Sequence, residues 1–148
     1  MSNYTQIYWQ IVFSTKYRKP VLLKENREKL FKYIWGILKN KECVLYRVNG
    51  IEDHIHIFTH VHPTIAISDL IKDIKRATNS YIKKSNIFPE FTAWQKGYGA
   101  FTYSTREKHT IINYVKNQEE HHNTISFIDE YKQLLKDNDV DFDENHLL

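Results

Sequence analysis

Cysteine, glycine and proline are all scarce in this chain, and each scarcity excludes a kind of architecture. A single cysteine, Cys43, cannot form a disulfide within the chain, which excludes a small domain held together by internal disulfides. Four glycines and three prolines in 148 residues leave no flexible or proline-rich linker, and no repeat or low-complexity segment is present. We therefore expect a single domain spanning residues 1–148.

Long apolar runs are also absent. Charged residues interrupt every apolar stretch within about ten residues, which is too short for a helix that crosses a bilayer. The N-terminus lacks the basic and then apolar pattern of a secretory signal. An apolar share of 41% still suffices for one hydrophobic core. We expect a soluble protein of the cytoplasm.

The net charge of +3 conceals an uneven distribution along the chain. Residues 1–118 sum to +10, whereas residues 119–148 carry two lysines and nine acidic residues and sum to −7. A basic body is suited to a phosphate backbone, although ordinary solvated side chains explain the charge equally well. Some of the abundant aromatic residues could stack on unpaired bases, but most should lie in the core.

Hydrophobic periodicity predicts an alternation of strands and helices. We expect strands over residues 4–13, 43–49, 53–61 and 97–103, and helices over residues 22–39, 65–84, 105–121 and 126–137. Alternation in the first segment indicates a strand that is buried on one face. The order of elements is typical of a ferredoxin-like split βαβ fold. The fold class is therefore α+β, with an antiparallel sheet of four to five strands and helices packed on it.

Two histidines, His54 and His56, form the most distinctive local feature. On a strand both project from one face, while Ile55 projects from the other face toward the core. Two imidazoles make up half of a metal site, but a solvated polar strand face produces the same pattern. His60 and His62 follow on the same face and could join the pair only if the strand bent sharply.

A tyrosine on the predicted helix 105–121 is the second feature. Tyr114 and Gln118 lie one turn apart, at the margin of the buried side. The Tyr114 hydroxyl could enter a cleft there, or could simply lie at the surface. A phenol is a poor nucleophile at neutral pH, but it can attack a phosphodiester that a divalent cation binds and aligns. The products would be a tyrosyl 5′-phosphate and a free 3′-OH, and another 3′-OH could reverse the step.

Together these motifs resemble the HUH single-tyrosine transposases of the insertion-sequence 200/605 type, and their relatives associated with repetitive extragenic palindromes. The resemblance rests on His54-Ile55-His56 and on Tyr114-Val115-Lys116-Asn117-Gln118. Three further segments also resemble the sequence patterns of this family: residues 13–20, 94–101 and 117–122. The resemblance covers essentially the whole chain, and its motifs occur in the family's order.

The resemblance implies an activity, a set of site residues and partners. Tyr114 would be the nucleophile, and His54, His56 and Gln118 would bind Mg²⁺ or Mn²⁺. The enzyme would cleave and rejoin single-stranded DNA at hairpin-marked element ends through a 5′-phosphotyrosine. It would act as a homodimer, with the histidines of one subunit facing the tyrosine of the other.

Two further expectations concern the surroundings of these motifs. Many relatives have Asn before the first histidine, and Asp53 takes that place here; on a strand it should point away from the pair and affect the metal little. The catalytic core should span about residues 4–122, and the acidic segment 123–148 has no assigned role. Basic residues of the first loop and the second helix are candidates for phosphate contact: Lys16, Arg18, Lys19, Lys72, Lys75, Arg76 and Lys83.

Three other functions share some of these features. A domesticated protein that grips DNA hairpins without cutting would share the basic surface, but it would have no need of the His54, His56, Tyr114 and Gln118 set. A replication initiator or relaxase-type nickase would use the same chemistry with larger appendages. A zinc hydrolase built on the four histidines from His54 to His62 would leave Tyr114 without a role.

Overall fold

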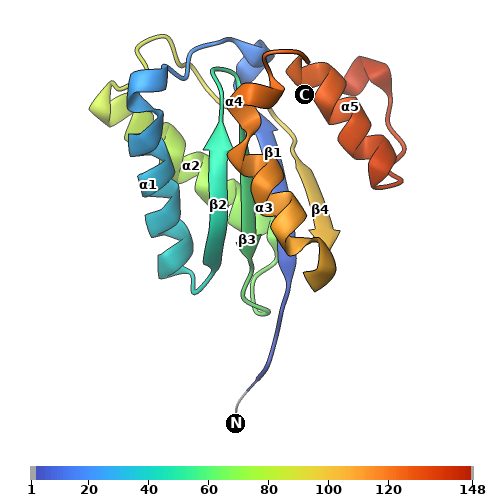
Figure 1. The fold of residues 1–148 in the computed structure, drawn as a ribbon. Coiled ribbons are helices and arrows are strands. Elements are labelled where there is room, and N and C mark those ends of the chain that lie inside the picture. Colours follow the sequence, from blue (N-terminus) through green and yellow to red (C-terminus); the bar gives the residue numbers. More distant parts are fainter. Residues whose placement is uncertain (1–2, 148) are drawn as a thin grey trace.

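The computed structural model describes residues 3–147 and contains a four-stranded sheet with helices on both of its faces (Figure 1). All strand pairs are antiparallel, and their order in the sheet is β2-β3-β1-β4. The strands are β1 (Tyr8–Ser14), β2 (Val44–Gly50), β3 (His54–His60) and β4 (Gly99–Tyr103). The helices are α1 (Lys24–Asn40), α2 (Ile67–Ser85), α3 (Lys108–Lys116), α4 (Gln118–His121) and α5 (Phe127–Asp137), with short 3-10 turns at Lys16–Arg18, Thr105–Glu107 and Glu144–His146. The predicted α+β class is confirmed, with four strands.

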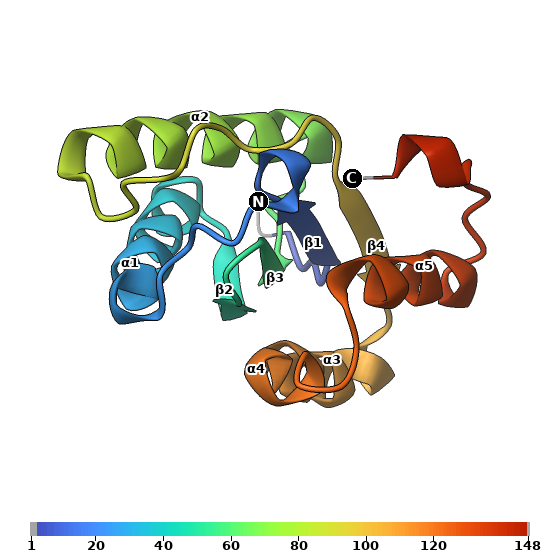
Figure 2. The same cartoon turned by 90° about the horizontal axis from the view of Figure 1, so that it is seen from above.

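Helices α1 and α2 cover one face of the sheet, and α3, α4 and α5 lie on the other (Figure 2). Ile11, Phe13, Ile55 and Ile57 belong to the main core on the α1 and α2 side. On the opposite face Val12 packs with residues of α5. The prediction that the first strand is buried on one face only is therefore wrong, because this central strand has helices on both sides. Its regular part also begins at Tyr8 rather than at residue 4.

A tight hairpin connects β2 to β3 and sets the position of the histidine pair. Gly50 pairs with Ile55 across the hairpin. A Cβ atom at Gly50 would lie 2.3 Å from the carbonyl oxygen of His54, so only glycine allows this close approach. His54 therefore begins β3 directly after the turn.

The helix expected over residues 105–121 is interrupted. A capping box at Ser104 and Glu107 begins it, as the sequence indicates, and the Glu107 carboxylate accepts a hydrogen bond of 3.0 Å from the backbone N–H of Ser104. Helix α3 then ends at Lys116, and Asn117 (φ −95°, ψ 23°) separates it from α4. Asparagine is a poor helix-interior residue because its side chain competes for backbone hydrogen bonds.

None of the helices within residues 3–147 combines the length and the apolar character that crossing a membrane requires.

Candidate metal and tyrosine site

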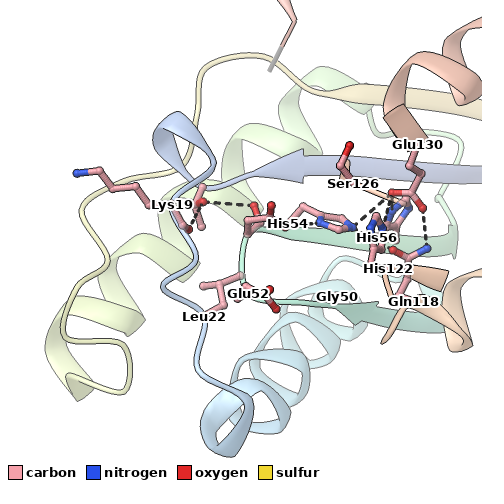
Figure 3. A network of polar contacts seen from close by, with 12 residues as sticks. Lys19, Leu22, Gly50, Glu52, His54, His56, Gln118, His122, Ser126 and Glu130 are labelled. Atoms are coloured by element: carbon pink, nitrogen blue, oxygen red, sulfur yellow. Dashed lines mark hydrogen bonds and ion pairs between the residues drawn. The ribbon is translucent and has the colours of Figure 1, made fainter. Parts of the chain in front are cut away.

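The side chains of His54 and His56 contact Gln118 of α4 and Glu130 of α5, so they lie on the face of the sheet that these helices cover, and both are fully buried. Their ring centroids lie 5.1 Å apart. Gln118, at the start of α4, is also fully buried, and its Oε1 lies 3.0 Å from His54 Nε2 (Figure 3). The structure thus brings together the three residues that the resemblance assigns to the metal.

Tyr114 reaches the same site from α3. Its ring centroid lies 5.7 Å from that of His56, and its hydroxyl donates a hydrogen bond to Glu130 Oε2. The tyrosine and the histidines of one chain are therefore neighbours, without any contribution from a second chain.

Glu130 also belongs to this cluster, although no motif in the sequence predicted it. It lies on α5, is only 2% exposed, and points at the histidines (Figure 3). Its Oε1 lies 3.0 Å from the Nε2 atoms of both His56 and His122, and 3.4 Å from His54 Nε2. Its Oε2 accepts a hydrogen bond of 3.0 Å from the side-chain amide of Gln118.

One feature of the sequence could have revealed Glu130. The buried residues of α5 are Phe127, Glu130, Tyr131, Leu134 and Leu135, which have the spacing of one apolar helix face. An acidic side chain within such a face needs a buried partner, because burying an unpaired charge is costly. Residues 119–148 contain nine acidic residues, and Glu130 is the one that lies among the buried residues of α5.

Burial and mutual charge shift the pKa values in this cluster. Burial alone would raise the pKa of Glu130, but its contacts with His56 and His122 hold that pKa far below its usual range. Burial lowers the pKa of His56, in spite of the nearby carboxylate. Burial would also lower the pKa of His122, but its bond to Glu130 raises it above the usual value. Burial and the charge of Glu130 raise the pKa of Tyr114 well above its ordinary value.

Asp53 contacts the site, contrary to the expectation that it points away. Its Oδ1 lies 2.7 Å from Nδ1 of His54. The expectation assumed strand geometry for Asp53, but β3 begins only at His54. A hydrogen on Nδ1 donated to Asp53 leaves the Nε2 lone pair of His54 directed at Gln118 and Glu130, which is the tautomer that a metal ligand requires.

A second chain of polar contacts supports His56. Tyr103 donates a hydrogen bond of 2.7 Å to Gln10 Oε1, and the Gln10 amide nitrogen lies 3.2 Å from His56 Nδ1. With the Gln10 amide turned over, its carbonyl would accept a hydrogen from His56 Nδ1 and leave Nε2 free to bind a metal. Gln10 can thus support either tautomer of His56.

The donor atoms of this cluster fit a divalent cation. Gln118 donates through its amide to Glu130, so its Oε1 faces His54 Nε2 at 3.0 Å. Two lone pairs at that distance repel each other unless a proton or a cation lies between them. Neighbouring ligands of an octahedral cation such as Mg²⁺ are about 3 Å apart, given metal–ligand distances of about 2 Å. The three imidazole and carboxylate donor atoms of His54, His122 and Glu130 lie within 4.8 Å of one another.

His60 and His62 do not join this cluster. His60 Nδ1 accepts a hydrogen bond of 3.0 Å from the backbone N–H of Ile7, and His62 Nδ1 lies 2.7 Å from the Thr64 hydroxyl. This agrees with the prediction from the sequence, because β3 would have to bend sharply to turn both rings inward.

The basic residues proposed for phosphate contact lie apart from the histidines. Lys72, Arg76 and Lys83 are exposed on α2, on the opposite side of the sheet (Figure 2). Lys75 is half-buried on α2, donates to the Gln95 carbonyl at 2.9 Å, and burial lowers its pKa to about 8. The remaining three, Lys16, Arg18 and Lys19, are exposed around the short turn after β1.

A cavity of about 320 Å³ reaches Tyr114 between α3, β4 and α5. Its lining includes Gln10 and Tyr103 as well as the acidic residues Glu107 and Asp137. The tyrosine is therefore accessible along one edge of the site, whereas His54 and His56 are closed off from solvent.

An α+β sheet with a buried histidine pair, a glutamine and a tyrosine is the arrangement that the resemblance seen in the sequence implies for a DNA transposase. Residues 3–118 match the family described as IS200-like transposases, and the chain belongs to this family. No curated protein matches the chain in sequence.

Two solved structures share the fold. A candidate transposase from Deinococcus radiodurans is 22% identical, with a TM-score of 0.64 over 80% of this chain and 95% of the other. A REP-associated tyrosine transposase bound to a REP hairpin is 15% identical, with a TM-score of 0.63 over 84% of this chain and 76% of the other. Helix α5, which carries Glu130, lies outside residues 3–118, which match the family.

Proposed function

We propose that this transposase cleaves and rejoins single-stranded DNA with Tyr114 as the nucleophile and His54, His56 and Gln118 as ligands of Mg²⁺ or Mn²⁺. The observation that carries the proposal is the convergence of Tyr114, from α3, with the buried His54 and His56 of β3. These residues are far apart in sequence, and packing alone gives no reason to gather them around a buried polar centre.

The chemical step is a transesterification. Tyr114 Oη forms a bond to the scissile phosphorus, and the bond between phosphorus and the 3′ oxygen breaks. The phenol loses its proton and the departing oxygen gains one, which leaves a free 3′-OH and a 5′-phosphotyrosine. A second 3′-OH can attack the phosphotyrosine and reverse these changes, so strands are exchanged without hydrolysis.

The side chains of the site prepare this step. The pKa of Tyr114 is raised, so the phenol is protonated in the resting protein and must lose its proton as it attacks. A bound divalent cation would offset the charge of the phosphate and align it with the phenol. Asp53 and Gln10 orient the imidazoles of His54 and His56.

Hairpin-bearing single-stranded DNA is the proposed substrate. One solved structure with this fold is bound to a REP hairpin, and residues 1–118 have a net charge of +10. We propose that exposed basic residues contact DNA that flanks the reacting phosphate, since α2 lies across the sheet from Tyr114. The exposed residues proposed for this contact are Lys16, Arg18, Lys19, Lys72, Arg76 and Lys83, and the half-buried Lys75 is proposed with them.

The decisive test is a covalent adduct. The native chain, incubated with Mn²⁺ or Mg²⁺ and labelled single strands that carry a hairpin, should form a protein–DNA band that survives a denaturing gel. Tyr114→Phe should form none, because the phenyl ring keeps the packing but lacks the attacking oxygen. Tyr33→Phe, on α1 across the sheet, is the matched control and should form the adduct normally. An adduct of undiminished yield with Tyr114→Phe would refute the proposal.

A hairpin-binding protein that does not cut is the alternative. The contact of Tyr114 with Glu130 and the burial of both histidines favour it, because a phosphate can reach the site only if α3 or α5 shifts. Such a protein would retard the labelled strand on a native gel and yield no adduct under any metal condition.

We also propose that each site uses groups of a single chain, whether or not the protein is a homodimer. The resemblance implies shared sites, but the short distance between the Tyr114 and His56 rings within one chain supports a site that needs no partner.

A further inference from the structure

We propose that Glu130 is an additional, anionic ligand of the cation, supplied by a helix outside the residues that the family shares. This inference rests on the proposed metal site at His54, His56 and Gln118, and extends it. Glu130 lies on α5 (Phe127–Asp137), whereas the family match ends at residue 118.

The first argument is the surroundings of the carboxylate. Glu130 is 2% exposed, and its contacts within the described chain are side chains that are neutral unless a histidine is protonated. A buried carboxylate needs a positive charge nearby. A divalent cation among the same donors would supply that charge and leave the imidazoles neutral, as metal binding requires.

The second argument is where the lone pairs point. His54 can donate its Nδ1 hydrogen to Asp53, and His122 can donate its Nδ1 hydrogen to the carbonyl oxygen of Ile125 at 2.8 Å. Both rings then direct an Nε2 lone pair at Glu130 Oε1, at 3.4 Å and 3.0 Å respectively. With Gln118 Oε1 also facing His54, several acceptor atoms converge on one point, as they do around a cation.

The third argument is that the two carboxylate oxygens face different partners. Oε1 faces the imidazoles of His54, His56 and His122. Oε2 accepts hydrogen bonds from Tyr114 and Gln118 and lies 3.5 Å from His121 Nε2. Glu130 can therefore bind a cation through Oε1 while Oε2 keeps the tyrosine hydroxyl beside it. The same side chain would position both the metal and the nucleophile.

Manganese binding tests this proposal without any reaction. The full chain is titrated with Mn²⁺, and binding is measured as the loss of the EPR signal of the free ion. The affinity for Mn²⁺ should fall roughly 10- to 100-fold or more in Glu130→Gln, because even residues that only support a metal ligand have effects of that size. Asp129→Asn makes the same charge change at an exposed position on the same helix, and should leave the affinity unchanged. The rise in melting temperature on adding Mn²⁺ is a second readout, and it should be smaller for Glu130→Gln and for Glu130→Ala.

The outcomes separate this inference from the proposed function. If His54→Ala abolishes Mn²⁺ binding and Glu130→Gln binds as tightly as the native chain, Glu130 is not a ligand but the His54 site stands. A higher yield of the protein–DNA adduct from Glu130→Gln, at unchanged Mn²⁺ affinity, would likewise overturn the proposal. It would mean that Glu130 restrains Tyr114 and does not bind the cation. If the native chain binds no Mn²⁺ at all, the metal site of the proposed function fails, and this inference fails with it.

Discussion

Asp53 illustrates how one side chain outside the recognised motif can orient a proposed metal ligand. Its carboxylate accepts a hydrogen bond from Nδ1 of His54, and so determines that Nε2 is the ring nitrogen that faces the site. The sequence placed both histidines on one face of a strand, as the structure does, but it placed Asp53 on the wrong side, since strand alternation does not apply to the turn residue before β3.

Removing this contact should weaken the proposed metal site. Asp53→Ala is expected to lower Mn²⁺ affinity by roughly 10- to 100-fold, because the imidazole loses the acceptor that sets its tautomer and orientation. Asp53→Asn keeps an acceptor oxygen and should stay close to the native affinity. Isothermal titration of Mn²⁺ measures both, with Glu90→Gln, an exposed loop residue, as the control. Equal affinity for Asp53→Ala and the native chain would contradict the role given to Asp53.

At the scale of elements, the β2–β3 hairpin determines where the histidines lie. Gly50 makes the turn possible because a side chain there would collide with the His54 backbone, whereas Gly36 in α1 has no atom near its missing Cβ. The two glycines therefore provide a matched pair of substitutions with opposite expected effects.

Gly50→Ala should reduce the free energy of unfolding by about 1–3 kcal/mol, as overpacking of a tight contact does. Gly36→Ala, within the helix α1, should increase it by about 0.5–1 kcal/mol, because alanine loses less backbone entropy on folding. Urea unfolding followed by circular dichroism measures both changes. A stabilised Gly50→Ala variant would show that the hairpin relaxes easily and does not constrain His54.

The helix that carries the tyrosine was only partly predictable. Its capping box and its apolar spacing were visible in the sequence, but the interruption at Asn117 was not. Because α4 begins a new helical segment, the direction of the Gln118 side chain depends on the contacts of that segment with Glu130 and His54, which lie far away along the chain.

At the scale of the whole molecule, the charge asymmetry has a structural counterpart. The acidic C-terminal segment is not merely an appendage to a basic body, because α5 packs on Val12 and Phe101 of the sheet and places Glu130 in the site. The catalytic core was expected to end near residue 122, but Glu130, which lies beyond that residue, also contacts the histidines.

Mixing two inactive variants tests whether the site belongs to one chain. If each site uses its own tyrosine, Tyr114→Phe mixed with His54→Ala should give no adduct beyond the sum of the two alone. If subunits exchange tyrosines, the mixture should recover up to about a quarter to a half of the native yield, since mixed dimers would contain one intact site. Both variants should be confirmed as folded by circular dichroism before mixing, and His56→Ala can replace His54→Ala.

The sequence by itself determined the class of fold, the strand with its histidine pair, and the start of the helix that carries Tyr114. These follow from local periodicity and from motif spacing, which act over a few residues. Only the tertiary structure decided that Glu130, His122 and Asp53 surround the same point. Their positions depend on how α5 docks and where β3 begins, and such contacts between distant residues leave no period in the sequence.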